Sequence, residues 1–123
     1  MSKMTSVYIG LLKEDGCEPS SRAGYMRIQT PGRVSEAQLS QIAEIVARTT
    51  VVFNDVVAPG YGEITTIAAF TAPHGGVPVW TQHLSAPLDI HTGVIPFVYK
   101  GQLMRGVAVQ AQVNMQSADL CNL

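Results

Sequence analysis

Hydrophobic and polar positions alternate along most of this chain, with the spacing of β-strands that bury one face. Near the start, Val7, Ile9 and Leu11 alternate with Tyr8 and Gly10. A period of two predicts a strand, and turn-forming residues at both ends of a short apolar segment strengthen the prediction. The same reasoning predicts six further strands in the segments 23–30, 51–57, 63–70, 77–85, 93–100 and 102–113.

The segment 35–48 departs from this alternation and predicts the one helix of the chain. Ser35 and Gln38 have the spacing of a capping box, in which each side chain binds a backbone N–H of the first turn. Glu36 suits the positive end of the helix dipole. The apolar positions fall on one helical face, and they are Leu39, Ile42, Ala43 and Val46.

Short strands about ten residues apart, joined by Gly- and Pro-containing turns, favour antiparallel pairing over a parallel α/β arrangement. We therefore expect a mainly β protein, an antiparallel β-sandwich of about seven strands with one helix near residues 35–48. At 123 residues, the chain has the length of one compact domain, so residues 1–123 are expected to form a single domain.

Composition narrows the classes of function. Hydrophobic residues make up 46% of the chain and charged residues only 14%, so we expect a partner to cover part of the apolar surface. The formal net charge of −1 gives no basic field for nucleic acid. The N-terminus has no signal-peptide pattern, and no apolar stretch reaches the length of a membrane span.

Two cysteines, Cys17 and Cys121, lie near opposite ends of the chain. A disulfide between them is one alternative, because chain termini often lie close together. Free thiols are the expectation, since nothing in the sequence indicates secretion.

The histidines are candidates for reactive chemistry, because imidazole titrates near neutral pH and binds metals. His74, His83 and His91 match no common metal-binding spacing, so neither a metal nor another cofactor is expected. Ser85, Asp89 and His91 allow a hydrolase triad as an alternative. Since Ser85 lacks the strained elbow of a nucleophilic serine, we expect the protein not to be an enzyme.

Glu14, Asp15 and Glu18 form an acidic cluster in the first long loop. Carboxylates bind calcium, but the spacing of a calcium-binding loop is missing and Lys13 adjoins the cluster. A solvated loop is the preferred interpretation.

Aromatic side chains offer contact sites, because they bind sugars and protein partners. Tyr61, in a glycine-flanked turn, is expected to be exposed and available for contacts, whereas Trp80 is expected to pack in the core. Tyr61, Trp80 and His83 together define an alternative function as a carbohydrate- or ligand-binding β module.

The order of several short motifs resembles a family of small β-rich structural domains from tailed bacteriophages and prophages. The resemblance covers roughly residues 6–113. Its motifs, in chain order, are YIGLLKEDG, GYMR (24–27), TTVVFND, EITTIAAFTAPHGG, WTQHLSAPLDI and VIPFVYKGQLMRGVAV.

This resemblance implies a structural role in a virion, in a tail, fibre or head appendage, without catalysis. It also implies a homo-oligomer that contacts other virion proteins, located in the virion or, before assembly, in the bacterial cytoplasm. Symmetric oligomers are the usual state of such subunits. A glycan remains the alternative partner.

Overall fold

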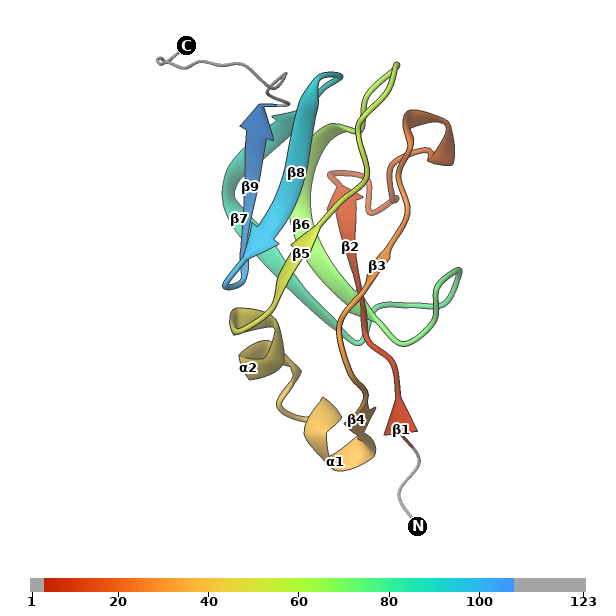
Figure 1. Ribbon diagram of the computed structural model, residues 1–123, viewed down its shortest axis with the longest axis vertical. Helices are drawn as coiled ribbons and strands as arrows, with labels where there is room; N and C mark the ends of the chain where they lie inside the picture. The colour runs from red at the N-terminus through yellow and green to blue at the C-terminus, as the bar shows by residue number, and fades with distance from the viewer. Residues whose placement is uncertain (1–3, 108–123) are drawn as a thin grey trace.

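The computed structural model describes residues 4–107, which form mainly antiparallel β-structure with a few short helical turns (Figure 1). Its strands are β1 (Met4–Thr5), β2 (Tyr8–Lys13), β3 (Ile28–Gln29), β4 (Val34–Ser35), β5 (Thr50–Val52), β6 (Gly62–Phe70), β7 (Trp80–Ile90), β8 (Val94–Tyr99) and β9 (Gln102–Val107). The helical elements are the 3-10 turn η1 (Ser21–Ala23), α1 (Glu36–Leu39) and α2 (Ile42–Ala47).

The strands are arranged in three sheets, and every pair in them is antiparallel. One sheet has the order β3-β2-β6-β7, the second has the order β5-β8-β9, and β1 pairs with β4 in a two-residue ladder. The antiparallel β-sandwich expected from the sequence is confirmed. All seven predicted strands are present, and the short β1 and β4 are additional.

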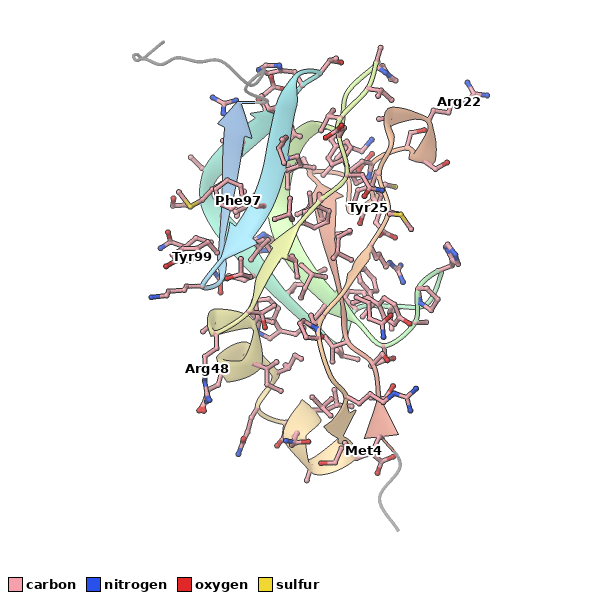
Figure 2. All side chains as sticks on the ribbon, viewed as in Figure 1. Met4, Arg22, Tyr25, Arg48, Phe97 and Tyr99 are labelled. Atoms are coloured by element: carbon pink, nitrogen blue, oxygen red, sulfur yellow. The ribbon has the colours of Figure 1, made fainter. Side chains whose placement is uncertain are left out.

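The hydrophobic core lies between the four-stranded and three-stranded sheets (Figure 2). Alternation directs Ile9 and Leu11 of β2 inward. In β6 a register shift between Ile64 and Thr66 lets both Ile64 and Ile67 face the core. Val98 of β8 meets them from the other sheet, and all five are completely buried. Burying an Ile or Leu side chain contributes about 1.5–3 kcal/mol, so this alternation determines which face of each sheet turns inward.

The predicted helix over 35–48 is two short helices instead of one. The capping box is confirmed, because Gln38 N donates to Ser35 Oγ at 3.3 Å and Ser35 N donates to Gln38 Oε1 at 2.8 Å. The helix then ends, and the Ser40 hydroxyl donates to the Ala37 carbonyl at 2.7 Å, a local bond that competes with helix propagation.

The break after Leu39 reorients the second helix. In α2, Ile42 and Val46 are buried and Ile45 is half-buried, whereas Ala43, which we placed on the buried face, is exposed. Packing of apolar side chains, more than intrinsic propensity, stabilises helices this short. The turn therefore directs the larger apolar residues of α2 to the core.

Two predicted strands are much shorter in the structure because backbone turns interrupt them. The segment 23–30 keeps only β3, since Gly24 ends η1 with a φ of +88°. The segment 51–57 keeps only β5: Phe53 N still donates to the Pro96 carbonyl at 2.9 Å, and then Val57 N donates to the Ala23 carbonyl at 2.9 Å.

The predicted strand over 77–85 is displaced toward the C-terminus. β7 begins at Trp80 and continues to Ile90, through a segment that we expected to be a loop. The register shifts between the pairs Thr66↔His83 and Ile64↔Leu88, which leaves residues 84–87 in an irregular bulge. Such a bulge accommodates Pro87, because proline has no N–H for the ladder.

The last strand follows its predicted alternation where its side chains are described. Leu103 packs against the core, whereas Gln102 and Met104 are exposed. Residues 108–113 of the predicted strand lie outside the described part of the chain, as does Cys121.

Candidate functional site

The three residues of the alternative triad are not joined by any hydrogen bond within residues 4–107. Ser85 is exposed in the bulge of β7. His91 Nδ1 lies 2.9 Å from the Thr92 carbonyl oxygen, and the Asp89 carbonyl oxygen accepts a bond from Arg105 at 2.7 Å. Ser85, Asp89 and His91 therefore do not form with one another the nucleophile–base pair that a hydrolase needs.

The three proposed contact residues are not brought together. Tyr61, expected to be exposed, is 2% exposed and packs edge-on against Tyr25, with ring centroids 5.4 Å apart. Burial, and then the nearby Asp55 carboxylate, raises the pKa of Tyr61 to about 12. Trp80 packs half-buried against the core, and His83 is exposed with Nδ1 3.0 Å from Thr66 Oγ1.

The prediction that Tyr61 is exposed was wrong, because burial of its apolar ring stabilises the fold more than exposure in a turn would. The glycines on either side have φ values of +93° and +87°, a conformation that glycine adopts without strain. These two turns direct the Tyr61 ring inward, where burying its large apolar surface stabilises the fold.

The acidic loop does not form a cation site. Asp15 Oδ1 accepts the N–H of Cys17 at 2.9 Å, and Glu18 points away from the loop to pair with Arg27. No cluster of three or more His, Cys, Asp or Glu with metal-binding geometry occurs in the part of the chain that the structure describes.

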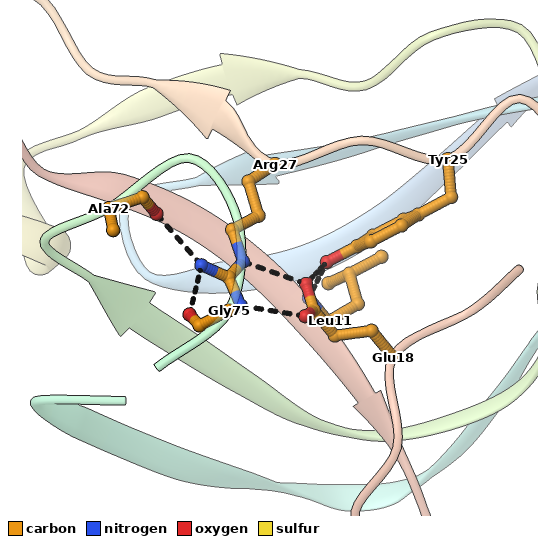
Figure 3. Close-up of polar contacts among 6 residues, drawn as sticks. All are labelled: Leu11, Glu18, Tyr25, Arg27, Ala72 and Gly75. Atoms are coloured by element: carbon orange, nitrogen blue, oxygen red, sulfur yellow. Dashed lines mark hydrogen bonds and ion pairs between the residues drawn. The ribbon is translucent and has the colours of Figure 1, made fainter. Parts of the chain in front are cut away.

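The pair formed by Glu18 and Arg27 is the centre of a buried polar network (Figure 3). Arg27 donates to both carboxylate oxygens of Glu18, through Nε at 2.9 Å and Nη2 at 2.8 Å. Its Nη1 donates to the carbonyls of Ala72 at 2.8 Å and Gly75 at 2.9 Å. The guanidinium also lies 3.4 Å from the centroid of the Phe70 ring, so it connects three separate segments.

Tyr25 extends this network to the backbone of the sheet. Its hydroxyl donates to Glu18 Oε2 at 2.5 Å and accepts the N–H of Leu11 at 3.0 Å. β3 pairs with β2 only at Tyr8 and Ile9, so Leu11 lies past the end of β3. The Tyr25 hydroxyl thus binds a backbone donor that burial would otherwise leave unsatisfied.

Gly10 makes room for this arrangement. A Cβ at this position would lie 2.7 Å from Tyr25 Oη and 2.9 Å from Phe70 Cε1, distances at which atoms overlap. The first long loop can therefore close over β2 only because residue 10 has no side chain.

The charges of the network make stability depend on pH. Burial alone raises the pKa of Glu18, but hydrogen bonds from Arg27 and Tyr25 outweigh it, so the pKa lies below its ordinary value of 4.5. The unfolded chain then binds the proton more readily, so the contribution of Glu18 to stability is present above pH 4.5 and is lost as the pH falls through the folded-state pKa.

We expect denaturant unfolding, followed from neutral pH to about pH 3, to show this loss in the wild-type protein. Glu18→Gln removes the titrating group, so the variant should start less stable and lose less stability over the same interval. Parallel pH profiles for the two proteins would contradict the assignment.

A groove of about 450 Å³ runs beside the network. Its walls include Tyr8, Met26, Gln29 and His74 together with the network itself. This volume is within the range of small-molecule sites, which usually hold a few converging polar groups. Here the charged groups in the wall bind one another, so the network mainly holds the loops in place.

The outer face of the β5-β8-β9 sheet has a different character, because it is apolar although it faces away from the core. Val52, Phe97 and Met104 lie directly opposite one another across the three strands. Val52 is 57% exposed and Met104 is 42% exposed, and Phe97 between them is half-buried. Facing side chains this close form one continuous surface.

Two more β8 residues extend this surface, which we call the outer apolar face. Tyr99 is 47% exposed at one end of β8, and Ile95 is half-buried near the other end, opposite Gly106. Phe97 and Tyr99 are labelled in Figure 2. Antiparallel sheets usually present polar residues on the face that meets water. Here the exposed polar residues Thr50 and Gln102 flank Tyr99, and the row through Phe97 is apolar.

The outer side of β7 provides the comparison. Thr81 and His83, opposite Ala68 and Thr66, are exposed there, and both are polar. The outer faces of the two sheets therefore differ in surface chemistry. The β5-β8-β9 face has more of the exposed apolar character that is typical of protein–protein contact surfaces.

No family model, curated protein or solved structure matches the chain. Within residues 4–107, the helices are too short and insufficiently apolar for a membrane crossing.

Proposed function

We propose that this chain is a structural protein of a bacteriophage or prophage particle, and that it acts in assembly through protein–protein contacts. The observation that carries the proposal is the outer apolar face, where Val52, Tyr99 and Met104 are between 42% and 57% exposed. Contiguous apolar surface of this kind on a soluble domain is typical of an interaction site.

The chemistry of the other candidate sites supports the same proposal. The buried Arg27 and the half-buried Glu18 satisfy each other's charge, and Arg27 also holds the loop at Ala72 and Gly75. Ser85, Asp89 and His91 are not hydrogen-bonded to one another in the described structure. The resemblance to phage structural domains adds the context of a virion, with the bacterial cytoplasm as the location before assembly.

A ligand-binding module is the second candidate, and the groove beside Arg27 favours it. Its residues would be Tyr8, Gln29 and His74 in place of the dispersed set Tyr61, Trp80 and His83. A glycan array that gives reproducible binding, lost on His74→Ala, would support this candidate over an assembly role.

Light scattering coupled to size exclusion tests the assembly proposal. We expect a mass above the 13.2 kDa of one chain, rising with loading concentration up to about 100 μM. A mass equal to one chain at every concentration would count against a subunit that assembles with itself.

A further inference from the structure

We propose that the outer edge of β3 binds an extended, uncharged segment of another polypeptide, which adds a strand to the β3-β2-β6-β7 sheet. In the described part of the chain, β3 is one of the two outermost strands of that sheet. Strand addition is a recurrent mode of peptide recognition, in which main-chain hydrogen bonds give affinity and alternate side chains give specificity. The inference goes beyond the proposed function, because it adds a contact surface that does not depend on the outer apolar face.

The ladder between β2 and β3 determines which main-chain groups face this edge. Thr30 N donates to the Val7 carbonyl at 2.8 Å, and the next pair along the ladder is Tyr8↔Gln29. Antiparallel pairs alternate between hydrogen-bonded and non-hydrogen-bonded ones, so Tyr8↔Gln29 is of the second kind. The N–H and the carbonyl of Gln29 therefore point away from β2, toward the outer side of the sheet.

Arg27 presents the same two groups one step earlier. Within residues 4–107, no main-chain hydrogen bond joins the N–H or the carbonyl of Arg27 to another residue. Arg27 as a whole is only 7% exposed, and main-chain groups with neither a partner nor full hydration are costly. An added strand pairs with every second residue of an edge, so Arg27 and Gln29 can bind one extended chain together.

The three-stranded sheet leaves this edge uncovered. Val57 N donates to the Ala23 carbonyl at 2.9 Å, so the chain after β5 reaches the segment before β3. Among the described residues, no main-chain hydrogen bond joins 50–57 to 25–29. The edge therefore lacks a partner strand from the second sheet over its whole length.

The groove beside the polar network follows this edge. Residues 25–29 line it without interruption, so both faces of this segment contribute to the wall. Pro19 contributes from the first long loop and His74 from the loop 71–79, and Figure 1 shows β3 between these two parts of the chain. The edge thus faces a hollow of about 450 Å³, in which a bound segment has walls on either side.

The opposite edge of the sheet is protected against strand addition. β7 contains the irregular bulge at 84–87 with Pro87, and bulges and prolines prevent pairing at an edge. The Asp89 carbonyl of β7 also accepts Arg105 Nη1 at 2.7 Å. Residues 25–29 contain no proline, so the β3 edge is the better site for an added strand.

Side chains along the β3 edge define the chemistry of the partner. Met26 is 51% exposed and Ile28 packs half-buried against the core, so one side of the edge is apolar. Tyr8, Gln29 and His74 line the groove with groups that form hydrogen bonds. Side chains of a strand alternate between its two sides, so a segment that alternates apolar and polar residues fits this edge.

The charges in the wall favour an uncharged partner. Glu18 and Arg27 neutralise each other through two hydrogen bonds of 2.8 and 2.9 Å. Neither is available as the counter-ion of a charged residue in the bound segment, and burying an unpaired charge is costly.

Amide hydrogen exchange of the protein alone tests whether the edge is open. The Gln29 N–H should exchange at least about tenfold faster than the Ile28 N–H, because only the latter faces β2 in the ladder. Equal protection of the two amides would overturn the proposal, since the Gln29 N–H would then already have a partner.

A capped hexapeptide of alternating valine and threonine is the probe for binding. Titrated into the full-length protein, it should bind with a Kd below about 1 mM and slow the exchange of the Gln29 N–H. Gln29→Pro removes that N–H without affecting the β2 ladder. It should bind the peptide at least about fivefold more weakly than Gln29→Ala, which loses the same side chain and keeps the N–H.

A second probe keeps the proposal falsifiable if Gln29→Pro does not fold. The same hexapeptide, N-methylated at every residue, has no N–H to donate and should not bind. Equal binding by the two variants or of the two peptides would overturn strand addition, as would no binding up to about 2 mM. Glycan binding that His74→Ala abolishes and Gln29→Pro leaves unchanged would assign the groove to a sugar instead.

Failure of this inference is distinguishable from failure of the assembly proposal. Light scattering on the protein alone tests assembly, whereas strand addition is tested by adding a peptide. A protein that self-associates and does not bind the hexapeptide would overturn the β3 site and leave the assembly proposal intact.

Discussion

Arg27→Met should lower the free energy of unfolding by about 3 kcal/mol, because it removes the partner of a charged group and the donors of two carbonyls. The variant leaves the Glu18 carboxylate without its partner and the carbonyls of Ala72 and Gly75 without donors. The guanidinium is almost fully buried, whereas Glu18 retains some solvent contact, which limits the cost of the unpaired charge. Urea unfolding followed by Trp80 fluorescence measures the change.

Arg22→Met is the matched control for this prediction. Arg22 is exposed and lies near Arg27 in the chain, and Figure 2 shows its label at the outer edge of the molecule. Exposed substitutions usually change stability by less than about 0.5 kcal/mol. Similar losses for Arg22→Met and Arg27→Met would mean that the network contributes little to the fold.

Gly24→Ala should lower stability by about 2–5 kcal/mol, because two costs add at this position. The residue has a φ of +88°, where an L-residue is strained by about 1–2 kcal/mol. A Cβ would also lie 2.6 Å from the Asp55 carbonyl oxygen, a backbone atom that can move only if the 54–57 segment shifts. Such overpacking costs about 1–3 kcal/mol.

Gly16→Ala separates the two costs. Gly16 has a similar φ of +82°, but no atom lies within 4 Å of its ideal Cβ. The control should therefore show the conformational strain alone, and the thermal midpoint of Gly24→Ala should be the lower of the two. If the two variants have the same midpoint, the close approach of residues 24 and 55 is not significant for stability.

The larger features of the fold could be predicted from the sequence because they depend on the period of burial. Alternation in β2 and β8 places large apolar residues on one face, and a shift of one residue would expose them. Strand ends were less predictable. The start of β7 at Trp80 depends on the bulge at residues 84–87, a long-range pairing that local turn residues do not determine.

The polar network was missed for a similar reason. Tyr25 and Arg27 are two residues apart and both bind Glu18. Glu18 itself lies before the 3-10 turn η1. The carbonyls of Ala72 and Gly75, which Arg27 also binds, are far away in sequence. The available signal was an Arg within a short apolar segment, since a buried guanidinium requires a carboxylate nearby.

Part of the outer apolar face could be predicted from the sequence of β8. The β8 sequence VIPFVY contains no polar residue that could face water except the Tyr99 hydroxyl, and an uninterrupted apolar strand is typical of one covered on both sides. The low charge content predicted that a partner covers some apolar surface. Which strands form that surface depended on the pairing of β5, β8 and β9.

A dilution series of backbone amide NMR spectra tests the central claim most directly, because it reports which residues change environment as copies separate. We expect concentration-dependent shifts to cluster at residues 50–52, 95–99 and 102–106, with the loop 71–79 unchanged. Spectra that do not change with concentration, or shifts centred on the groove beside Arg27, would contradict the claim that this chain acts through its outer apolar face.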